Sequence, residues 1–304
     1  MFKSRTRLAK KVTSLNSRRA KQKAKAITEL RHKYDLDILL HHTNMARSSY
    51  YYHNKRSLVI DKYEVIKRLI NQIYHHHKGR YGYRRITLEI NKKGILVNHK
   101  TILKLMRELG LKSLIRIKRY KSYKGQVGQT APNILQCNFK VVKPNKKWAT
   151  DITEFKVFGK KLYLSPIIDL FNGEIISYEL SERPNFKQVV TMLKKSFKKI
   201  PNQTNLILHS DQGWQYQMKQ YQRLLKEKGI TQSMSRKGNC LDNAVIENFF
   251  GILKSELFYL NKYRSITQLK KDIKEYIKYY NNERIKPNLK GMSPIEYRVH
   301  YYQN

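Results

Sequence analysis

Three kinds of feature are scarce in this sequence, and each scarcity excludes a class of protein. There are 2 cysteines in 304 residues, Cys137 and Cys240, and neither has a CxxC neighbour. Neither a disulfide scaffold nor a cysteine-rich zinc site is therefore expected. No apolar run approaches the roughly 18 to 20 residues that span a bilayer, and the first residues lack the apolar stretch of a secretory signal. We expect a cytoplasmic protein with no membrane partner.

Acidic residues are also scarce. Asp and Glu number 22 against 63 Lys and Arg, which gives a formal net charge of +41. Such an excess is hard to explain without a polyanionic partner. Hydrophobic residues make up 40% of the chain and aromatic residues 11%, which is enough for folded cores. Because the basic residues are mixed with Tyr, Phe and Leu along the whole chain, this composition favours a folded nucleic-acid binder over a membrane-surface peptide.

The N-terminal part of the chain is basic and has a helical pattern. Residues 1–25 contain ten basic residues and no acid, which indicates either a basic arm that binds phosphate or a solvated tail. The pattern of residues 26–57 predicts three short helices, with breaks near Asp35 and Asn44. This segment is predicted to be a small helical unit, with a helix-turn-helix as one interpretation.

Residues 58–113 show a clearer pattern of three helices. Asn98 is a good N-cap for the third helix, expected over residues 99–109, and Gly110 would end it. The apolar residues of this helix can face inward, which leaves four polar ones for solvent or a DNA groove: Lys100, Thr101, Lys104 and Arg107. The arrangement fits a helix-turn-helix DNA reader. An ordinary three-helix bundle with a solvated basic face is the alternative.

The pattern changes after a basic linker over residues 114–146. The elements expected from Trp148 onwards follow the order β-β-β-α-β-α-β-α-α, with WATDITEFKVFG as the first strand. This order predicts an α/β fold with a mixed five-stranded sheet flanked by helices. We expect this core over residues 147–262, followed by a C-terminal helical extension over residues 263–304.

Three acids stand out by their positions in these elements. Asp151 lies in the first strand, Asp211 lies where the fourth strand runs into DQGWQY, and Glu247 lies on the helix NAVIENFFGILKSE. Strand ends and an adjoining helix are where an α/β sheet gathers side chains into one site. Magnesium prefers carboxylate oxygens, and two ions roughly 4 Å apart can promote an in-line displacement at phosphorus. The sequence therefore predicts a metal site for phosphodiesters inside a basic, DNA-binding chain.

Four polar residues near these acids have simpler interpretations. Asp169 is expected to be structural, and Glu154 to lie on the opposite strand face as a solvent or salt-bridge residue. Asp242 precedes the helix of Glu247 and is most simply its N-cap. His209 lies two residues before Asp211, so it could orient substrate or be a packed histidine, and both readings stay open.

The spacing of the acids and four phrases resemble a known family. Thirty-five residues separate Asp211 from Glu247, and Lys254 follows Glu247 by seven, as in the DD(35)E signature. The phrases WATDITEF, LHSDQGWQY, SRKGNCLDNAVIENFFGILKSE and YYNNERIKPNLKGMSPIEY resemble the integrase-core transposases of bacterial insertion sequences. More narrowly, they are similar to the second-reading-frame product of the large family whose catalytic domain is related to retroviral integrase. The match runs from about residue 60 to the C-terminus.

The resemblance implies a ribonuclease H-like catalytic core preceded by an all-α helix-turn-helix region. It also implies that the three acids hold two Mg²⁺ or Mn²⁺ ions, and that the protein cleaves and joins DNA strands at element ends. Zinc is not expected, because the two cysteines cannot supply the paired ligands of the retroviral zinc module. Lys254 is expected to contact DNA near the element end. Further DNA-binding candidates lie beside it, on the same helix or the loop before it: Arg236, Lys237 and Asn243.

The same resemblance implies several partners. These are double-stranded DNA of the terminal repeats and the target, a second copy or more of this chain, and an upstream-frame DNA-binding protein that related elements join by frameshifting. A bacterial, nucleoid-associated location follows from binding DNA. Two rival functions remain: a plain metal-dependent nuclease that cuts without joining, and a DNA-binding regulator without catalysis. The basic modules before the core disfavour the first rival, and the three acids disfavour the second.

Overall fold

The computed structural model describes residues 20–58, 61–114, 131–136, 138–235 and 243–304. The chain divides into two compact units, residues 1–68 and residues 69–304, and each is described by itself. Several expectations fall outside the described residues: most of the basic arm, much of the linker, both cysteines, and the residues Arg236, Lys237 and Asp242.

The first unit contains a small group of three helices among the described residues. They are α2 (Ala20–Leu30), α3 (Leu36–Thr43) and α4 (Arg47–Leu58). Asp35 caps α3 by accepting a hydrogen bond from the Asp37 N–H, and Asn44 ends it in the left-handed conformation with φ 48°. Both predicted breaks are therefore confirmed. Helix α2 begins at Ala20, inside the segment expected to be a basic arm.

The next three helices are α5 (Glu64–His76), α6 (Tyr83–Lys92) and α7 (His99–Glu108). The predicted capping of α7 is confirmed, because the Asn98 side chain accepts a hydrogen bond of 2.8 Å from the Lys100 N–H. Gly110 follows the helix with φ 70°, a conformation that glycine adopts at little cost. Ile102, Leu105 and Met106 are buried, so the apolar stripe of α7 packs inward as its spacing predicts.

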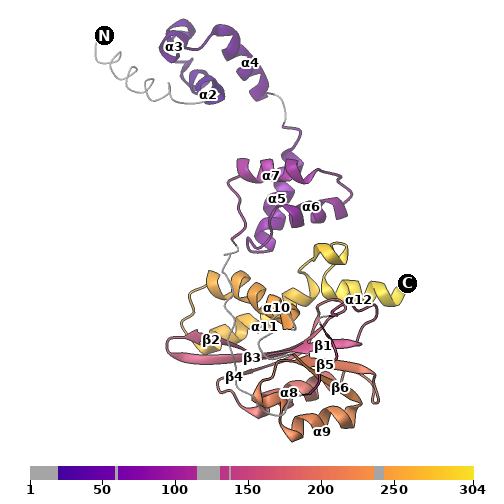
Figure 1. The fold of residues 1–304 in the computed structure, drawn as a ribbon. Helices are drawn as coiled ribbons and strands as arrows, with labels where there is room; N and C mark the ends of the chain where they lie inside the picture. Colours follow the sequence, from indigo (N-terminus) through magenta and orange to yellow (C-terminus); the bar gives the residue numbers. More distant parts are fainter. Residues whose placement is uncertain (1–19, 59–60, 115–130, 137, 236–242) are drawn as a thin grey trace. The chain divides into compact units, whose positions relative to one another are not determined.

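A mixed sheet with helices on both faces forms the centre of the second unit (Figure 1). Its six described strands are β1 (Lys147–Thr150), β2 (Thr153–Val157), β3 (Lys160–Asp169), β4 (Ile175–Ser181), β5 (Leu206–Ser210) and β6 (Ile230–Met234). Strand β5 is parallel to β1 and β6, whereas β3 is antiparallel to β1, β2 and β4. Because β1 and β2 both occupy one side of β3, β4 lies on its other side and forms an edge of the sheet.

The sequence predicted one strand where the structure has two, β1 and β2. The ladder pairs on either side of the break share one register, which sets Asp151 opposite Pro166. Proline has no N–H to donate to a ladder. The expected first strand is therefore interrupted at Asp151, and the five predicted strands become six.

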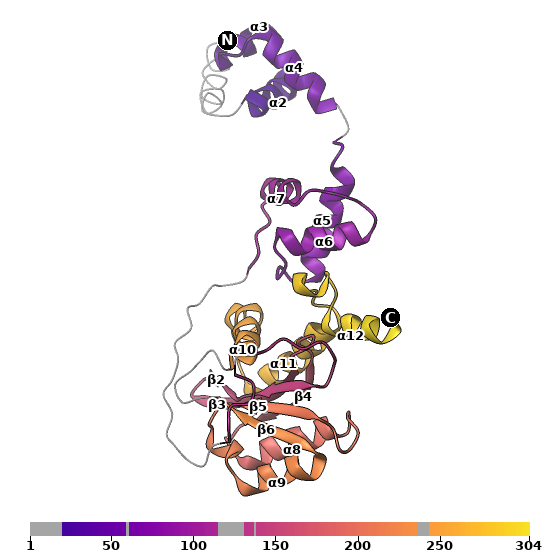
Figure 2. The ribbon, with the colours of Figure 1, turned by 45° about the vertical axis from the view of Figure 1, so that its right-hand side comes forward.

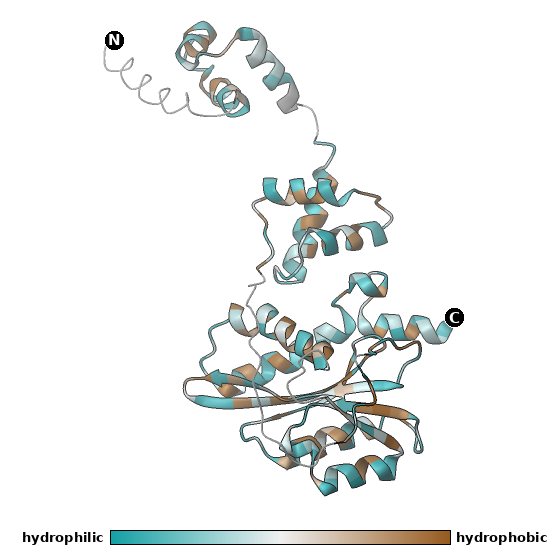
Figure 3. Cartoon of the chain, viewed as in Figure 1, coloured by the Kyte–Doolittle hydropathy of each residue, from teal (hydrophilic) through white to brown (hydrophobic). Residues whose placement is uncertain are grey.

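Helices cover both faces of the sheet. They are α8 (Phe186–Phe197), α9 (Lys219–Lys228), α10 (Ala244–Glu256), α11 (Ile266–Asn282) and α12 (Pro294–Gln303), with short 3-10 turns at Trp214–Tyr216, Phe258–Leu260 and Pro287–Leu289. Both ribbon views place α10 and α11 on one face and α8 and α9 on the other (Figure 2). Each face has its own buried apolar cluster, and Figure 3 shows the corresponding hydrophobic stretches along the strands.

The C-terminal segment packs against the sheet through α11. Helix α11 buries Leu269, Ile273 and Tyr280 in the same cluster as the sheet and α10. Helix α12 was not predicted, although Ser293 and Glu296 form a capping box at its start, which is a signal visible in sequence. Among the described residues, no helix is both long and apolar enough to cross a membrane.

Candidate active site

Asp151 and Asp211 lie side by side at the same end of the sheet. Each follows the last residue of its strand, β1 and β5 respectively. These strands are parallel neighbours, and their register pairs Ala149 with His209. Two residues further along the same register, Asp151 stands beside Asp211 on the same face of the sheet. The structure thus brings together two of the three predicted acids.

Local backbone contacts orient both carboxylates. Asp151 Oδ1 accepts a hydrogen bond of 2.6 Å from the Ile152 N–H, and Asp211 Oδ1 accepts one of 2.9 Å from the Gly213 N–H. A Cβ at position 213 would lie 2.4 Å from Gln215 Nε2 and 3.0 Å from Asp211 Oδ1. Glycine therefore allows the loop to close on the carboxylate.

The third acid, Glu247, lies in the first turn of α10. This helix buries Ile246, Phe249, Phe250 and Leu253 against the sheet. Glu247 is half-buried on the remaining face, and Lys254 is half-buried two turns further on with its Nζ 5.4 Å from the centre of the Phe155 ring. The helix therefore fixes the acid and the lysine through its packed side.

The charges of Asp211, Glu247 and Lys254 all act on Asp151. Burial raises the pKa of Asp151 well above its ordinary value, the charges of Asp211 and Glu247 raise it further, and the charge of Lys254 opposes them. Burial likewise raises the pKa of Asp211, against the Gly213 N–H. Neighbouring carboxylates removed from water repel one another, and a bound cation relieves that repulsion. The site therefore has the electrostatics of a cation-binding centre.

The donor set suits a hard divalent cation. Carboxylate oxygen is the ligand that magnesium prefers, and one or two carboxylates per ion are usual because water and substrate phosphate complete the shell. Asp151 and Asp211 supply such a pair. In the parts of the chain that the structure describes, no three His, Cys, Asp or Glu side chains form a complete metal-binding group. The residues fit an ion that is shared with substrate rather than one enclosed by protein.

The neighbouring polar residues take the simpler of their predicted roles. Asp169 is fully buried and its Oδ2 accepts a hydrogen bond of 2.7 Å from Arg298, so it is structural. Glu154 forms a salt bridge of 3.0 Å with Lys161. His209 is fully buried, with Nδ1 2.9 Å from the hydroxyl of Ser233, which favours the packed histidine over a substrate contact.

The predicted DNA-binding residues divide into three groups. Lys100, Lys104 and Arg107 are exposed on α7, with Thr101 half-buried beside them. Asn243 is only 5% exposed. It precedes α10 without a side-chain capping bond, so its expected place on a DNA-facing surface is not what the structure has. The reason is that the first turn of α10 packs against the core. Arg236 and Lys237 lie outside the described residues.

Sequence reasoning missed a buried ion pair at the other end of α10. Both Glu256 oxygens accept hydrogen bonds from Arg284, at 2.8 and 2.7 Å, and Oε2 also accepts one of 2.8 Å from the Tyr276 hydroxyl. Burial would raise the pKa of Glu256, but the hydrogen bond and charge of Arg284 lower it. Two further arginines donate hydrogen bonds to Glu256. Arg80, which precedes α6, donates to its backbone carbonyl, and Arg85, within α6, donates to its carboxylate.

Family models match three segments of the chain. Residues 141–240 and residues 247–301 match models described as integrase core domain, and residues 61–119 match one described as HTH-like domain. The matched segments cover the sheet, the helices of the second unit and the three helices α5 to α7.

Several insertion-sequence proteins are similar over most of the chain. InsK, named as a transposase for IS150 of Escherichia coli K12, is 57% identical over 278 residues, which are 91% of this chain and 98% of InsK. A transposase for IS904 of Lactococcus lactis is 36% identical over 77% of this chain and 93% of its own length. The catalytic core domain of HTLV-2 integrase, solved with magnesium, is 16% identical with a TM-score of 0.43, over 52% of this chain and 99% of that domain.

Proposed function

Because the chain belongs to the insertion-sequence transposases with an integrase core domain, we propose that Asp151, Asp211 and Glu247 are the acids of its active site. The protein is a transposase, an enzyme of the polynucleotidyl transferase type. One observation carries the assignment of residues. Two parallel strands end in neighbouring carboxylates, and the charges of Glu247 and Lys254 act on the first of them.

The proposed reaction uses one site for two displacements at phosphorus. In the first, the oxygen of water forms a bond to the phosphorus at an element end, and the bond to the 3′-oxygen breaks. That oxygen takes up a proton and becomes a free 3′-hydroxyl. In the second, this hydroxyl attacks a phosphodiester of target DNA, displaces another 3′-oxygen and joins the strands. Neither step needs a covalent bond to the protein.

The chain's own groups orient the reactants. Asp151 and Asp211 are held by the Ile152 and Gly213 N–H groups, so their oxygens need no rearrangement before substrate binds. We assign the binding of two Mg²⁺ or Mn²⁺ ions to these carboxylates and to Glu247. When bound, such ions activate the attacking oxygen and stabilise the leaving one. Lys254 adds a positive charge for a DNA phosphate near the same carboxylates.

DNA binding follows from the HTH-like domain of a transposase. We propose that α7 presents its exposed Lys100, Lys104 and Arg107, with Thr101, to the terminal repeat of the element. Because two ends must be joined to one target, we also propose that the protein acts as a dimer or larger assembly. Chromosomal DNA as substrate implies a cytoplasmic, nucleoid-associated location.

The proposal is tested with a labelled duplex that carries a candidate terminal repeat. Wild-type protein in Mg²⁺ should release a 3′-hydroxyl end and join it to a target duplex. Glu247→Gln should lose both activities by at least a hundredfold while its affinity for the duplex stays unchanged, and EDTA should abolish both activities in the wild type. The matched control is Glu227→Gln on α9, an exposed acid that pairs with Arg223 at 3.3 Å on its own helix, and it should retain full activity.

A pre-cut duplex with a free 3′-hydroxyl separates cutting from joining. A transposase joins this end without the first step, whereas a simple nuclease does not. If Glu247→Gln keeps metal-dependent joining of the pre-cut end, the assignment of Glu247 is wrong.

A further inference from the structure

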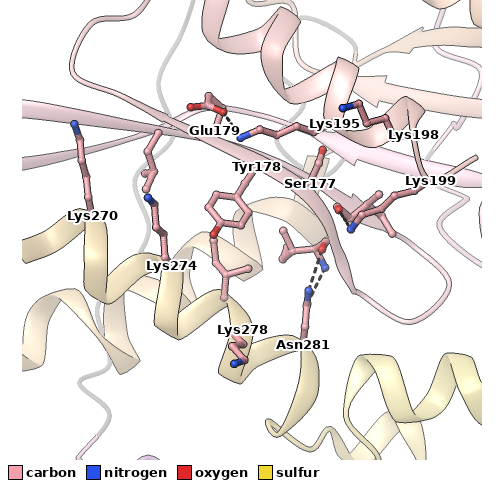
Figure 4. A pocket seen from close by; sticks show the side chains of 14 residues that line it. Ser177, Tyr178, Glu179, Lys195, Lys198, Lys199, Lys270, Lys274, Lys278 and Asn281 are labelled. Carbon is pink, nitrogen blue, oxygen red and sulfur yellow. Dashed lines mark hydrogen bonds and ion pairs between the residues drawn. The ribbon is translucent and has the colours of Figure 1, made fainter. Parts of the chain in front are cut away.

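A groove of about 740 Å³ runs along the edge strand β4, between α8 on one face of the sheet and α11 on the other. Figure 4 shows side chains from all three elements around it. Six lysines line the groove: Lys195, Lys198 and Lys199 from the end of α8, and Lys270, Lys274 and Lys278 from α11. Glu179 is the one acid among the lining residues, so the groove is strongly positive.

The lysines form two facing rows. On α11 the lysines recur every four residues, so the Cα atoms of successive lysines are roughly 6 Å apart along the helix axis. A DNA strand has a phosphate for about every 3.4 Å of its axis, so this spacing is close to two phosphates. The α8 lysines lie on the other side of β4 (Figure 4). A linear polyanion that lies between the rows would meet cations along both sides.

Half of these lysines have no partner among the described residues that would compete with a ligand. Lys195 pairs with Glu179 at 2.6 Å, and Lys270 with Glu182 at 2.6 Å. By contrast, the ammonium groups of three lysines make no hydrogen bond or ion pair with any residue that the structure describes, and all three are exposed: Lys198, Lys274 and Lys278. Three solvated positive charges are therefore ready to contact phosphate.

The backbone at the start of the groove is already occupied. The Asn281 side chain accepts a hydrogen bond from the Ile175 N–H and donates one to its carbonyl, both at 2.9 Å. Lys199 donates to the carbonyl of Ile176. A peptide that adds a strand to a sheet edge needs these backbone groups free. The groove therefore suits a ligand recognised through ammonium groups rather than through backbone pairing.

We propose that this groove binds the phosphate backbone of duplex DNA, independently of sequence. Strand β3 separates β4 from β1 and its Asp151, so DNA in the groove is not the phosphodiester that reacts. It is a second stretch of DNA, either target or flanking, held while the element end occupies the acids. The groove is thus a contact zone additional to the three acids and to α7. Its place in the reaction rests on the proposed function, whereas its affinity for DNA does not depend on the catalytic assignment.

The test measures binding in EDTA, so that no chemistry contributes. The groove variant is Lys198→Gln, Lys274→Gln and Lys278→Gln together. The control variant is Lys194→Gln, Lys219→Gln and Lys226→Gln, three exposed lysines of α8 and α9 outside the groove. Both variants lose three charges. Fluorescence anisotropy with a duplex of arbitrary sequence then gives the dissociation constant over a series of KCl concentrations.

In the groove variant, the plot of log affinity against log salt concentration should be less steep than in the wild type. The magnitude of its negative slope should fall by about 3, one for each lost phosphate contact. The control variant should change it by less than about 1, because its lysines contribute only to the general field. Equal slopes in the two variants would overturn the proposal. Glu247→Gln should stop cleavage but show the same salt dependence of DNA affinity as the wild type. The catalytic assignment and the groove proposal are therefore tested by different measurements.

A footprint on the wild-type protein covers the case in which the triple variant does not fold. Lysines are acetylated with and without duplex DNA, and the modified positions are read by mass spectrometry. DNA should protect Lys198, Lys274 and Lys278 severalfold while it leaves Lys194 and Lys226 reactive. Unchanged reactivity in the groove refutes the proposal. Protection that rises with protein concentration in the absence of DNA also refutes it, because the occupant is then a second copy of the chain.

Discussion

At the scale of single residues, the two carboxylates that we propose for the active site lie in an electrostatically unfavourable arrangement. Asp151 and Asp211 are neighbours across two parallel strands, and burial, together with the like charge, works against the ionised form of Asp151. Asp169, by contrast, is buried in contact with Arg298 and backbone N–H groups. Burial raises the pKa of Asp169 as well, but there the Phe171 and Asn145 N–H groups and the charge of Arg298 oppose the rise. Asp169 thus has partners that offset its burial, whereas the like charges beside Asp151 add to the effect of burial.

Exchange of Asp151 for its amide tests this contrast. Asp151→Asn should abolish strand transfer yet raise the free energy of unfolding in EDTA by about 1 kcal/mol, because it removes one of two repelling charges. Asp169→Asn should lower the free energy of unfolding by about 2 kcal/mol, because it removes one of the two carboxylates that Arg298 contacts and leaves only the pair with Glu174. Urea denaturation followed by circular dichroism measures both. A loss of stability in Asp151→Asn as large as that in Asp169→Asn would show that Asp151 is structural.

The sequence predicted the three acids but not how they meet. Their residue types and spacing were visible, and the resemblance to integrase-core transposases strengthened them. The parallel pairing of β1 with β5 joins positions that are far apart in the chain, and no local pattern encodes it. The burial of Asn243 was missed for a related reason, since a residue just before a helix looks exposed until the packing of α10 is known.

At the scale of elements, α10 is fixed along its middle and at its C-terminal end. Its middle packs on the sheet, and its last residue, Glu256, is held by the bidentate pair with Arg284 and by Tyr276. Because Glu247 lies on the same helix, an anchor at Glu256 limits the sliding or rotation of Glu247, the acid that we propose for the active site. The pair therefore contributes to positioning as well as to stability.

Removal of the negative charge of Glu256 should destabilise the folded protein. Glu256→Gln should lower the free energy of unfolding by about 3 kcal/mol or more at pH 7, because it leaves Arg284 buried and unpaired. Glu182→Gln, which breaks the exposed pair with Lys270, should cost less than about 1 kcal/mol. Chemical denaturation of the two variants beside the wild type measures the difference. Similar losses would mean that the Glu256 pair contributes no more than a surface ion pair.

The sequence predicted most elements correctly and failed where a single residue acts through tertiary structure. The three helices α5 to α7 were predicted from the spacing of their apolar residues, and the ends of α7 were predicted from Asn98 and Gly110. The division of the first strand depends on Pro166, a residue that lies on β3 and is opposite Asp151 only after folding. Helix α12 could have been predicted from Ser293 and Glu296, whereas the partners of Glu256 could not.

At the scale of the whole second unit, the helices before the sheet are tied to the catalytic region by specific contacts. The His77 ring stacks on Tyr81 with centroids 3.7 Å apart, and its Nδ1 lies 3.1 Å from the Tyr279 hydroxyl on α11. Tyr81 in turn accepts a hydrogen bond from the Ile285 N–H. The segment between α5 and α6 and the core therefore share a buried junction, made by His77, Tyr81, Tyr279 and Ile285.

The junction should weaken in mild acid because of His77. Burial, together with the charges of His76, Arg80 and Arg85, lowers the pKa of His77 from 6.5 to about 4, and the charge of Glu256 opposes this shift. Between pH 6.5 and pH 4 the unfolded chain therefore binds a proton that the folded chain does not, and stability falls as the pH falls through this window.

His77→Phe keeps an aromatic ring against Tyr81 and removes this titration. The wild type should lose about 1 to 2 kcal/mol more than His77→Phe between pH 7 and pH 5, after allowance for partial contact of the ring with water. His75→Phe, in the same tract but exposed, should follow the wild type. Urea unfolding at several pH values measures the three slopes. If His77→Phe loses as much stability as the wild type on acidification, the acid sensitivity lies elsewhere. If it loses less, the junction is the part of the second unit that responds first to acid, and the binding of terminal repeats and strand transfer should become uncoupled over the same pH window.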